Sequence, residues 1–326
     1  MTRDGVDALA RRFGVTRLAR LTDLDRCGVE VVAAVRPRGH VLQVSQGKGL
    51  TLKAARWSAL GEAIELAAAE APDAARLSFG PPPDDALWAP GDEAIAWAVG
   101  ERLDSGEPVS VPADAVYCPP GGVAWLGPSS SAWRSNGLGA HPTSRAAAVE
   151  HAVLELAERD ALARVAPDGW TPALALRCVE PPRGLAERLA ARGFELSVAD
   201  LTPPGDALPV VGALLFDAEE GPVPLTAGYA CRRSFDAAAT AAVLEAAQSR
   251  LTEIHGARED VMLGKREAGR GLRRLLQLAP RARAPRRLYR GPLADALRAP
   301  VAIVTLRKSP WVVKAVSDGL LLSDLL

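Results

Sequence analysis

The 326-residue sequence predicts an α+β fold in which mixed, largely antiparallel sheets pack against helices. Two observations predict it. Three separated segments have helical periodicity, and apolar strand-like runs lie between them. Consecutive runs such as Phe194–Leu201, Val210–Asp217 and Val223–Ala230 are joined by turns that are too short for a crossover helix, which favours antiparallel pairing. Strands followed by helices occur in both halves, so a diverged internal duplication is conceivable.

The three helical segments each gather acids, amides or hydroxyls on one face. They are Ser58–Glu70, Val149–Leu162 and Ala242–Ile254. A helix turns by about 100° per residue, which places one set of polar side chains on one face of each segment. In chain order the sets are Ser58, Glu62 and Glu65; Glu155, Glu158 and Arg159; and Glu245, Gln248 and Thr252. Carboxylates are costly to bring together, so three such rows indicate a common cation or polyphosphate. The alternative is that these faces are the solvated sides of amphipathic helices.

Glycine-rich segments precede the first two helices. Val41–Val44 alternates like a strand, Ser45–Gly49 (SQGKG) is expected to form a turn, and Thr51 can cap the following helix. A strand, a Gly-Lys-Gly turn and a helix N-terminus favour an anion near Lys48, although the Walker pattern of a P-loop is absent. Ser135–Gly139 (SNGLG) is likewise expected to be a turn. The alternative is that both segments are ordinary turns that bind no ligand.

The remaining pattern completes the expected order of elements. Strands are expected at Val29–Val35, Val301–Leu306 and Trp311–Val316. Helices are expected at Glu93–Leu103 and Leu185–Arg192, and the proline-rich stretch Phe79–Asp92 is expected to be a loop.

The overall composition excludes several classes of protein. Hydrophobic residues make up 48%, and 39 basic residues balance 39 acidic ones, so there is no general attraction to nucleic acid or to a membrane surface. No apolar stretch could span a bilayer, and charges at the N-terminus replace the apolar run of a signal peptide, which indicates a cytoplasmic location. The cysteines form no CxxC pair, and we expect reduced, buried thiols at Cys27, Cys118, Cys178 and Cys231.

One segment is strongly basic. Pro280–Pro292 (PRARAPRRLYRGP) contains five arginines and no acid. The simplest interpretation is a solvated, partly disordered loop. The functional alternatives are docking of an acidic leader peptide or of a partner protein, whereas Tyr289 alone gives little support for nucleic-acid stacking.

Three strings carry a resemblance to a known family. SQGKGLTLKAARWSALGEAIE, SNGLGAHPTSRAAAVEHAVLELAERDAL and EAAQSRLTEIHGARED resemble the three signature regions of the YcaO family, in the same order. They define motif regions at 45–70, 135–162 and 242–260. The lengths between them suggest that residues 1–326 form one YcaO-like domain.

The resemblance implies an activity and its cofactors. YcaO proteins use ATP and magnesium to phosphorylate the oxygen of a peptide backbone amide, after which a nucleophile attacks the activated carbon. A Cys, Ser or Thr side chain gives an azoline, and an external sulfide gives a thioamide. The resemblance further implies a ribosomal precursor peptide or protein as substrate, a TfuA-like partner and a homodimer, with no nucleic acid and no membrane.

The resemblance also assigns residues. Magnesium ligands would be Glu62, Glu65, Glu155 and Glu158, and the nucleotide site would add Lys48, Ser58, Arg159, Gln248 and Arg258. No catalytic nucleophile or base is identified on the chain.

Two departures from the family pattern bear on the activity. Leu66 follows Glu65 where many members have Arg, and some members of the branch that works beside TfuA also lack this Arg. Ala147 stands where an acid is usual. No proline follows Pro310, whereas azoline-forming members end in a proline-rich tail, so thioamidation is favoured over azoline formation. The alternative is a degenerate domain that binds a peptide or partner without ATP chemistry.

Overall fold

The structure, a computed structural model, describes residues 3–128, 133, 137–221, 223–256 and 266–322. These residues form seven α-helices: α1 Arg3–Arg12, α2 Leu52–Ala69, α3 Arg145–Val165, α4 Pro172–Ala175, α5 Arg183–Ala190, α6 Phe235–His255 and α7 Arg266–Leu278. The three long helices α2, α3 and α6 contain the segments predicted from polar periodicity. Each begins at a hydroxyl N-cap, supplied by Thr51, Ser144 and Ser234.

The strands form three sheets, and every pairing between their strands is antiparallel, as the short connections predicted. The first contains β1 Arg17–Arg20, β2 Glu30–Val35 and β3 Val44–Gly49. The second has the order β11-β10-β9-β8, with β8 Cys178–Val179, β9 Phe194–Asp200, β10 Val210–Asp217 and β11 Leu225–Cys231. The third has the order β4-β5-β12-β13-β7, with β6 paired to β5; its bounds are β4 Leu77–Gly80, β5 Ile95–Arg102, β6 Pro108–Pro112, β7 Leu138–His141, β12 Ala302–Lys308 and β13 Trp311–Val316.

One glycine on each of three strands allows a helix to pack unusually close. A Cβ added at Gly47 of β3 would lie 1.9 Å from the Ala59 nitrogen of α2. A Cβ at Gly139 of β7 would lie 2.0 Å from the Ala148 oxygen of α3, and one at Gly228 would lie 2.2 Å from a nitrogen of α6. Only glycine fits such an approach of backbone to backbone. Three strand–helix units therefore share one mode of packing.

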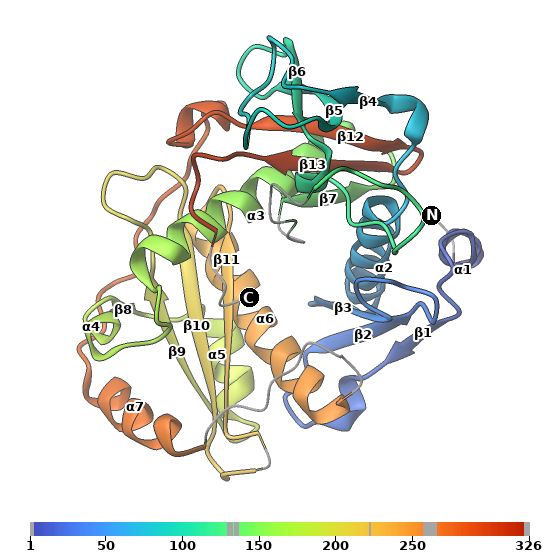
Figure 1. The fold of residues 1–326 in the computed structure, drawn as a ribbon. Helices are drawn as coiled ribbons and strands as arrows, with labels where there is room; N and C mark the ends of the chain where they lie inside the picture. Colours follow the sequence, from blue (N-terminus) through green and yellow to red (C-terminus); the bar gives the residue numbers. More distant parts are fainter. Residues whose placement is uncertain (1–2, 129–132, 134–136, 222, 257–265, 323–326) are drawn as a thin grey trace.

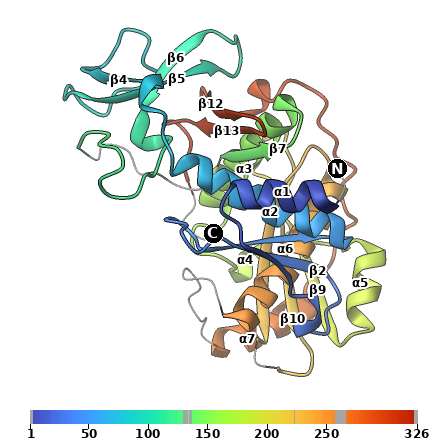
Figure 2. The same ribbon diagram turned by 90° about the vertical axis from the view of Figure 1, so that its right-hand side faces the viewer.

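These three units are arranged cyclically. Beyond its own strand, α2 also contacts β7, α3 contacts β11 and α6 contacts β3. In Figure 1 the helices α2, α3 and α6 accordingly stand around the centre of the molecule, with the sheets outside them. Figure 2 shows that the β4–β6 region extends from one end, away from the β8–β11 sheet. The same strand–helix packing therefore occurs three times in the described residues.

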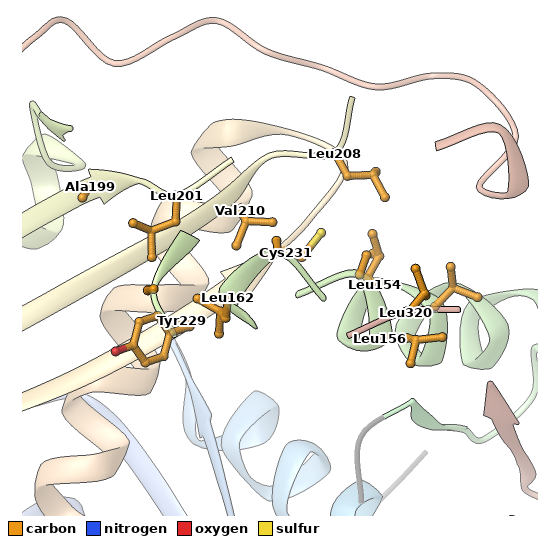
Figure 3. Close-up of a cluster of buried hydrophobic side chains, with 14 of the residues drawn as sticks. Leu154, Leu156, Leu162, Ala199, Leu201, Leu208, Val210, Tyr229, Cys231 and Leu320 are labelled. Carbon is orange, nitrogen blue, oxygen red and sulfur yellow. The ribbon is translucent and has the colours of Figure 1, made fainter. Parts of the chain in front are cut away.

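The largest apolar cluster joins the middle of the chain to its C-terminal part. Figure 3 shows Leu154 and Leu162 of α3 beside Val210 and Cys231 of the β8–β11 sheet, with Leu320 from the segment after β13. All four cysteines are free thiols, and Cys118 is partly exposed whereas the other three are buried. Within the described residues no helix is long and apolar enough to cross a membrane.

The prediction of a turn at Ser45–Gly49 was wrong. This segment forms most of strand β3, and the strand predicted at Val41–Val44 begins only at its last residue. The glycines are there because the strand lies against α2, not because the chain reverses. In the second glycine-rich segment, Leu138 and Gly139 likewise belong to strand β7, while Ser135 and Asn136 lie outside the described residues.

The helix predicted at Glu93–Leu103 was also wrong, because this stretch contains strand β5. Pairing with β4, β6 and β12 overrides its alanine-rich composition. The basic segment 280–292 is mostly exposed and belongs to no named helix or strand, as expected of a solvated loop. It is an extended chain whose main chain bonds to β8 at one end and to the start of α6 at the other.

Candidate functional site

The first polar helix face is held by main-chain donors of two strands. Glu62 of α2 accepts a hydrogen bond from the Gln46 N–H of β3 at 2.9 Å. Glu65, one turn later, is buried and accepts from the Ala140 N–H of β7 at 2.7 Å. The two carboxylates therefore tie α2 both to its own strand and to the strand of the next unit.

The second helix repeats this arrangement. Glu155 of α3 accepts from the Leu138 N–H of β7 at 3.2 Å, and buried Glu158 accepts from the Cys231 N–H of β11 at 2.9 Å. Leu138 and Gln46 each precede the glycine that packs against the helix. Glu62 and Glu155 are thus equivalent positions in their units, and so are Glu65 and Glu158.

The third helix closes the cycle with neutral groups. Thr252 of α6 donates to the side-chain oxygen of Gln46 at 2.6 Å, and the Gln248 amide donates to the Gln46 carbonyl at 3.3 Å. Lys48 of β3 forms an ion pair with Glu245 of α6 at 2.8 Å. The first and third sequence motifs are therefore joined directly through β3.

The buried carboxylates influence one another. Burial, with the neighbouring charges of Glu155 and Glu62, raises the pKa of Glu65 to about 8. Burial and the charge of Glu245 raise the pKa of Glu158 to about 7. Such shifts mean that the ionised carboxylates are poorly stabilised in this interior, mainly by loss of hydration and secondly by the neighbouring acids, and a bound cation would relieve both effects.

Lys314 is a site residue that the sequence motifs did not reveal. It lies on β13 opposite Leu138, is 2% exposed, and has its Nζ 5.1 Å from the centre of the Trp133 ring. Burial lowers its pKa to about 7, although the charges of Glu155 and Glu65 act in the opposite direction. One signal in the sequence was available: a single lysine interrupts the apolar strand WVVKAV.

Arg159 provides the complementary charge. It lies 3.7 Å from Glu155, and its buried Nε and Nη1 atoms have no hydrogen-bond partner within the described part of the chain. The Oε1 of Gln248, a buried acceptor, also has no hydrogen-bond partner among the described residues. Buried donors without acceptors are costly, so the two Arg159 nitrogens fit an anionic ligand, while the adjacent carboxylates and the acceptor oxygen of Gln248 fit a cation. A magnesium–phosphate group has both properties.

The structure brings together most of the predicted residues, though not equally. Lys48, Glu62, Glu65, Glu155, Glu158, Arg159 and Gln248 form the connected network above, whereas Ser58 is exposed on α2 one turn before Glu62. Arg258 lies outside the described residues. Leu66 is buried with Leu138, so no guanidinium could take its place without rearrangement, and the N–H of Ala147 bonds to the Ser144 cap at 3.1 Å.

His151 also borders this network. It is exposed on α3 one turn before Glu155, the position that Ser58 holds on α2 and Glu245 on α6. Within the described residues, no three Asp, Glu, His or Cys side chains are grouped closely enough to hold a metal ion unaided.

Comparison with known proteins gives this site a family context. The family model described as YcaO cyclodehydratase, ATP- and Mg2+-binding, matches residues 82–311. A Methanothermobacter thermautotrophicus protein named only as uncharacterized is 33% identical over 292 residues, which cover 82% of this chain and 73% of that protein. A Rhizobium leguminosarum bv. trifolii protein, described as lying in the tfuA 3' region, is 32% identical, covering 77% of this chain and 65% of the relative.

Solved structures agree with the fold. YcaO from Methanopyrus kandleri, bound with AMPPCP and Mg2+, matches with a TM-score of 0.75 and 26% identity, over 95% of this chain and 87% of that one. A heterocyclase in complex with substrate and cofactor matches with a TM-score of 0.73 at 18% identity, over 97% of this chain and 52% of that one; at this identity the likeness supports the fold alone. The family match, the relatives and the cyclic carboxylate network lead to one conclusion: this chain belongs to the YcaO family.

Proposed function

We propose that this protein uses ATP and Mg2+ to activate backbone amides of a ribosomal peptide or protein by O-phosphorylation. The observation that carries the proposal is the burial of Glu65 and Glu158, together with two buried Arg159 nitrogens that have no hydrogen-bond partner among the described residues. This combination suits a metal-bound polyphosphate better than an internal ion pair. The AMPPCP and Mg2+ bound to the Methanopyrus kandleri protein support the same cofactors.

The chemistry explains why such a site is useful. An amide carbonyl carbon is a poor electrophile because of resonance, and phosphorylation of its oxygen creates a leaving group. Mg2+, when bound, neutralises phosphate charge, and it is usually held by one or two carboxylates together with phosphate oxygens and waters. The chain then has to position the phosphates and the amide rather than supply covalent chemistry.

Residue roles follow from the contacts. We assign metal binding to the carboxylates of Glu62, Glu65, Glu155 and Glu158, whose orientations are fixed by main-chain N–H donors, with each ion shared between one or two of them and phosphate oxygens. We assign phosphate contact to Arg159, and nucleotide contact to Lys48, Ser58 and Gln248, with Arg258 as a further candidate from the sequence. One YcaO-like domain over residues 1–326 and a homodimer complete the proposal.

ATP turnover tests the proposal. Glu155→Gln and Glu158→Gln should each lower Mg2+-dependent ATP hydrolysis by at least about a hundredfold, because each removes a charge from the metal site. Glu150→Gln is the control, since this acid lies on the same helix, is 42% exposed and pairs with Arg233. Hydrolysis unchanged in both test variants, with all three proteins folded by circular dichroism, would leave peptide or partner binding without ATP chemistry as the function.

Thioamidation is the product that we favour over an azoline. Leu66 at the end of the first motif and the relative in a tfuA 3' region support a TfuA-like partner and an external sulfur donor. Coexpression with a precursor peptide and a TfuA-like protein encoded beside the gene should increase the peptide mass, since sulfur replaces oxygen. A mass decrease corresponding to loss of water would instead identify an azoline.

A further inference from the structure

The basic segment 280–292 forms the outer edge of the β8–β11 sheet. The Ala282 N–H donates to the Cys178 carbonyl at 3.0 Å, and the Ala282 carbonyl accepts from the Glu180 N–H at 2.9 Å. These bonds continue the sheet beyond β8 as a parallel bridge. In Figure 1 the segment runs from α7 towards β12 along the outside of this sheet.

The far end of the segment is fixed as well. The Phe235 N–H donates to the Arg287 carbonyl at 3.0 Å, and the Tyr289 N–H donates to the Arg233 carbonyl at 2.8 Å. Ala284 and Tyr289 pack against the apolar core. The exposed edge is therefore a defined, extended surface rather than a mobile chain.

The main chain of this edge has hydrogen-bonding capacity to spare. Because both polar groups of Ala282 face β8, those of Arg281 and Arg283 point the other way. They have no main-chain hydrogen bond to any residue that the structure describes. An unpaired edge of this kind accepts another extended chain.

The side chains determine which chain would fit. Arg281 and Arg287 are engaged, with the Leu196 carbonyl and with Asp200 respectively. Arg283, Arg286 and Arg290 are exposed and have no ion pair with a described residue. Three exposed guanidinium groups along an open edge are complementary in charge to the carboxylates of an acidic extended peptide.

We propose that an acidic, extended segment of the peptide substrate docks on this edge, pairing with the main chain of Arg281 and Arg283 and meeting Arg283, Arg286 and Arg290 with its carboxylates. This inference rests on the proposed action on peptides and adds the chemical class of the recognised segment. Docking at this edge would raise the local concentration of the amides to be modified.

Nucleic acid fits this edge less well than an acidic peptide. Binding of single strands usually requires aromatic faces on which bases stack. The only aromatic residue in the segment, Tyr289, is half-buried against the core, and its hydroxyl bonds to the Pro292 carbonyl at 2.6 Å. The main-chain edge, by contrast, is specific for a polypeptide.

Fluorescence anisotropy with a labelled peptide of alternating Glu and Ala tests the proposal without any ATP chemistry. The triple variant Arg283→Gln, Arg286→Gln, Arg290→Gln should bind the peptide at least about tenfold more weakly, because it loses three exposed charge pairs with the peptide. A control variant with the same charge change, Arg11→Gln, Arg17→Gln, Arg38→Gln, should bind as the wild type does, because these arginines are exposed and far along the chain from the edge. Added salt should weaken wild-type binding.

Several results would overturn the proposal. They are absence of binding to the wild type, equal losses in both triple variants, or tighter binding of a single-stranded RNA of matched charge. N-methylation of alternate amides in the probe should also abolish binding, and unchanged binding would exclude strand pairing. Both triple variants should keep wild-type affinity for ATP with Mg2+ by calorimetry, so failure of docking and failure of the ATP proposal are separable.

Discussion

At the scale of single residues, the decisive feature is the burial of Glu65 and Glu158. Charged carboxylates on amphipathic helices normally face water, and the simplest interpretation of these sequences was a set of solvated faces. Instead both acids lie inside, each accepting one main-chain N–H from the strand of the neighbouring unit. The amine of Lys314 is buried as well and interacts with Glu65 and Glu155, so acidic and basic groups meet in an enclosed centre.

The pH dependence of stability should report this burial. The pKa of Glu65 is raised in the folded protein from 4.5 to about 8, so its favourable contribution is complete below pH 4.5 and is lost as the pH rises towards 8. Without Mg2+, the free energy of unfolding of the wild type should therefore fall as the pH rises from 4.5 to about 7. Above about pH 7 the lowered pKa of Lys314 has the opposite effect on stability. Each group contributes up to about 1.4 kcal/mol per pH unit.

Urea denaturation across this pH range provides the measurement. Glu65→Gln should reduce the slope of stability against pH, because glutamine cannot titrate. Glu150→Gln, an exposed acid of α3, should keep the wild-type slope. Identical slopes for Glu65→Gln and the wild type would mean that this carboxyl group is not buried in the folded protein.

Much of the candidate site was predictable because its acids recur at helical spacing. Glu62, Glu65, Glu155 and Glu158 were identified from periodicity and motif, and the structure places each on a polar network. Lys314 was not, since it comes from the last strand and belongs to no motif. Its position depends on β13 pairing with β7, a contact between residues far apart in sequence.

At the scale of elements, small residues determine how the helices meet the strands. Gly47 faces Ala55 and Ala59 of α2, and the corresponding glycines of β7 and β11 face paired alanines of α3 and α6. This contact brings each helix close enough for its acids or amides to reach strand N–H or C=O groups. Sequence identity does not reveal this repeated packing, because the residues that the three units share are glycine and alanine, which are common throughout the chain.

Two glycine substitutions should therefore change stability in opposite directions. Gly47→Ala would place a Cβ 1.9 Å from a helix nitrogen and should lower the free energy of unfolding by about 3 kcal/mol or more. Gly61→Ala, on α2 with nothing within 4 Å of its added Cβ, should raise it by about 1 kcal/mol. Urea denaturation of both variants checks this, and a Gly47→Ala protein as stable as the wild type would refute the close packing.

Secondary structure was predictable where pattern and packing agree. The strand at Val210–Asp217 and the strand at Trp311–Val316 were predicted with the bounds found, because each is a short, largely apolar run that begins with β-branched or aromatic residues. The segment Ser45–Gly49 was mistaken for a turn, since glycine marks both turns and close approaches. Strand β5 was mistaken for a helix because its alanines are helix formers, and only its pairing on both sides makes it a strand.

At the scale of the whole molecule, the site exists only when distant parts of the chain meet. Its residues extend from Gln46 on β3 to Lys314 on β13, and each of the three central helices bonds to the strand of another unit. Sequence patterns predicted the α+β class and the antiparallel pairing. They could not predict that β12 and β13 insert between β5 and β7, because strand order is set by long-range contacts.

Calorimetric titration of ATP, with and without Mg2+, tests the central claim most directly. The wild type and Glu150→Gln should bind ATP with the same affinity when Mg2+ is present, and binding should weaken strongly without the metal. Glu155→Gln and Glu158→Gln should bind at least about a hundredfold more weakly. Absence of ATP binding to the wild type, or binding that is indifferent both to Mg2+ and to these two carboxylates, would contradict the account.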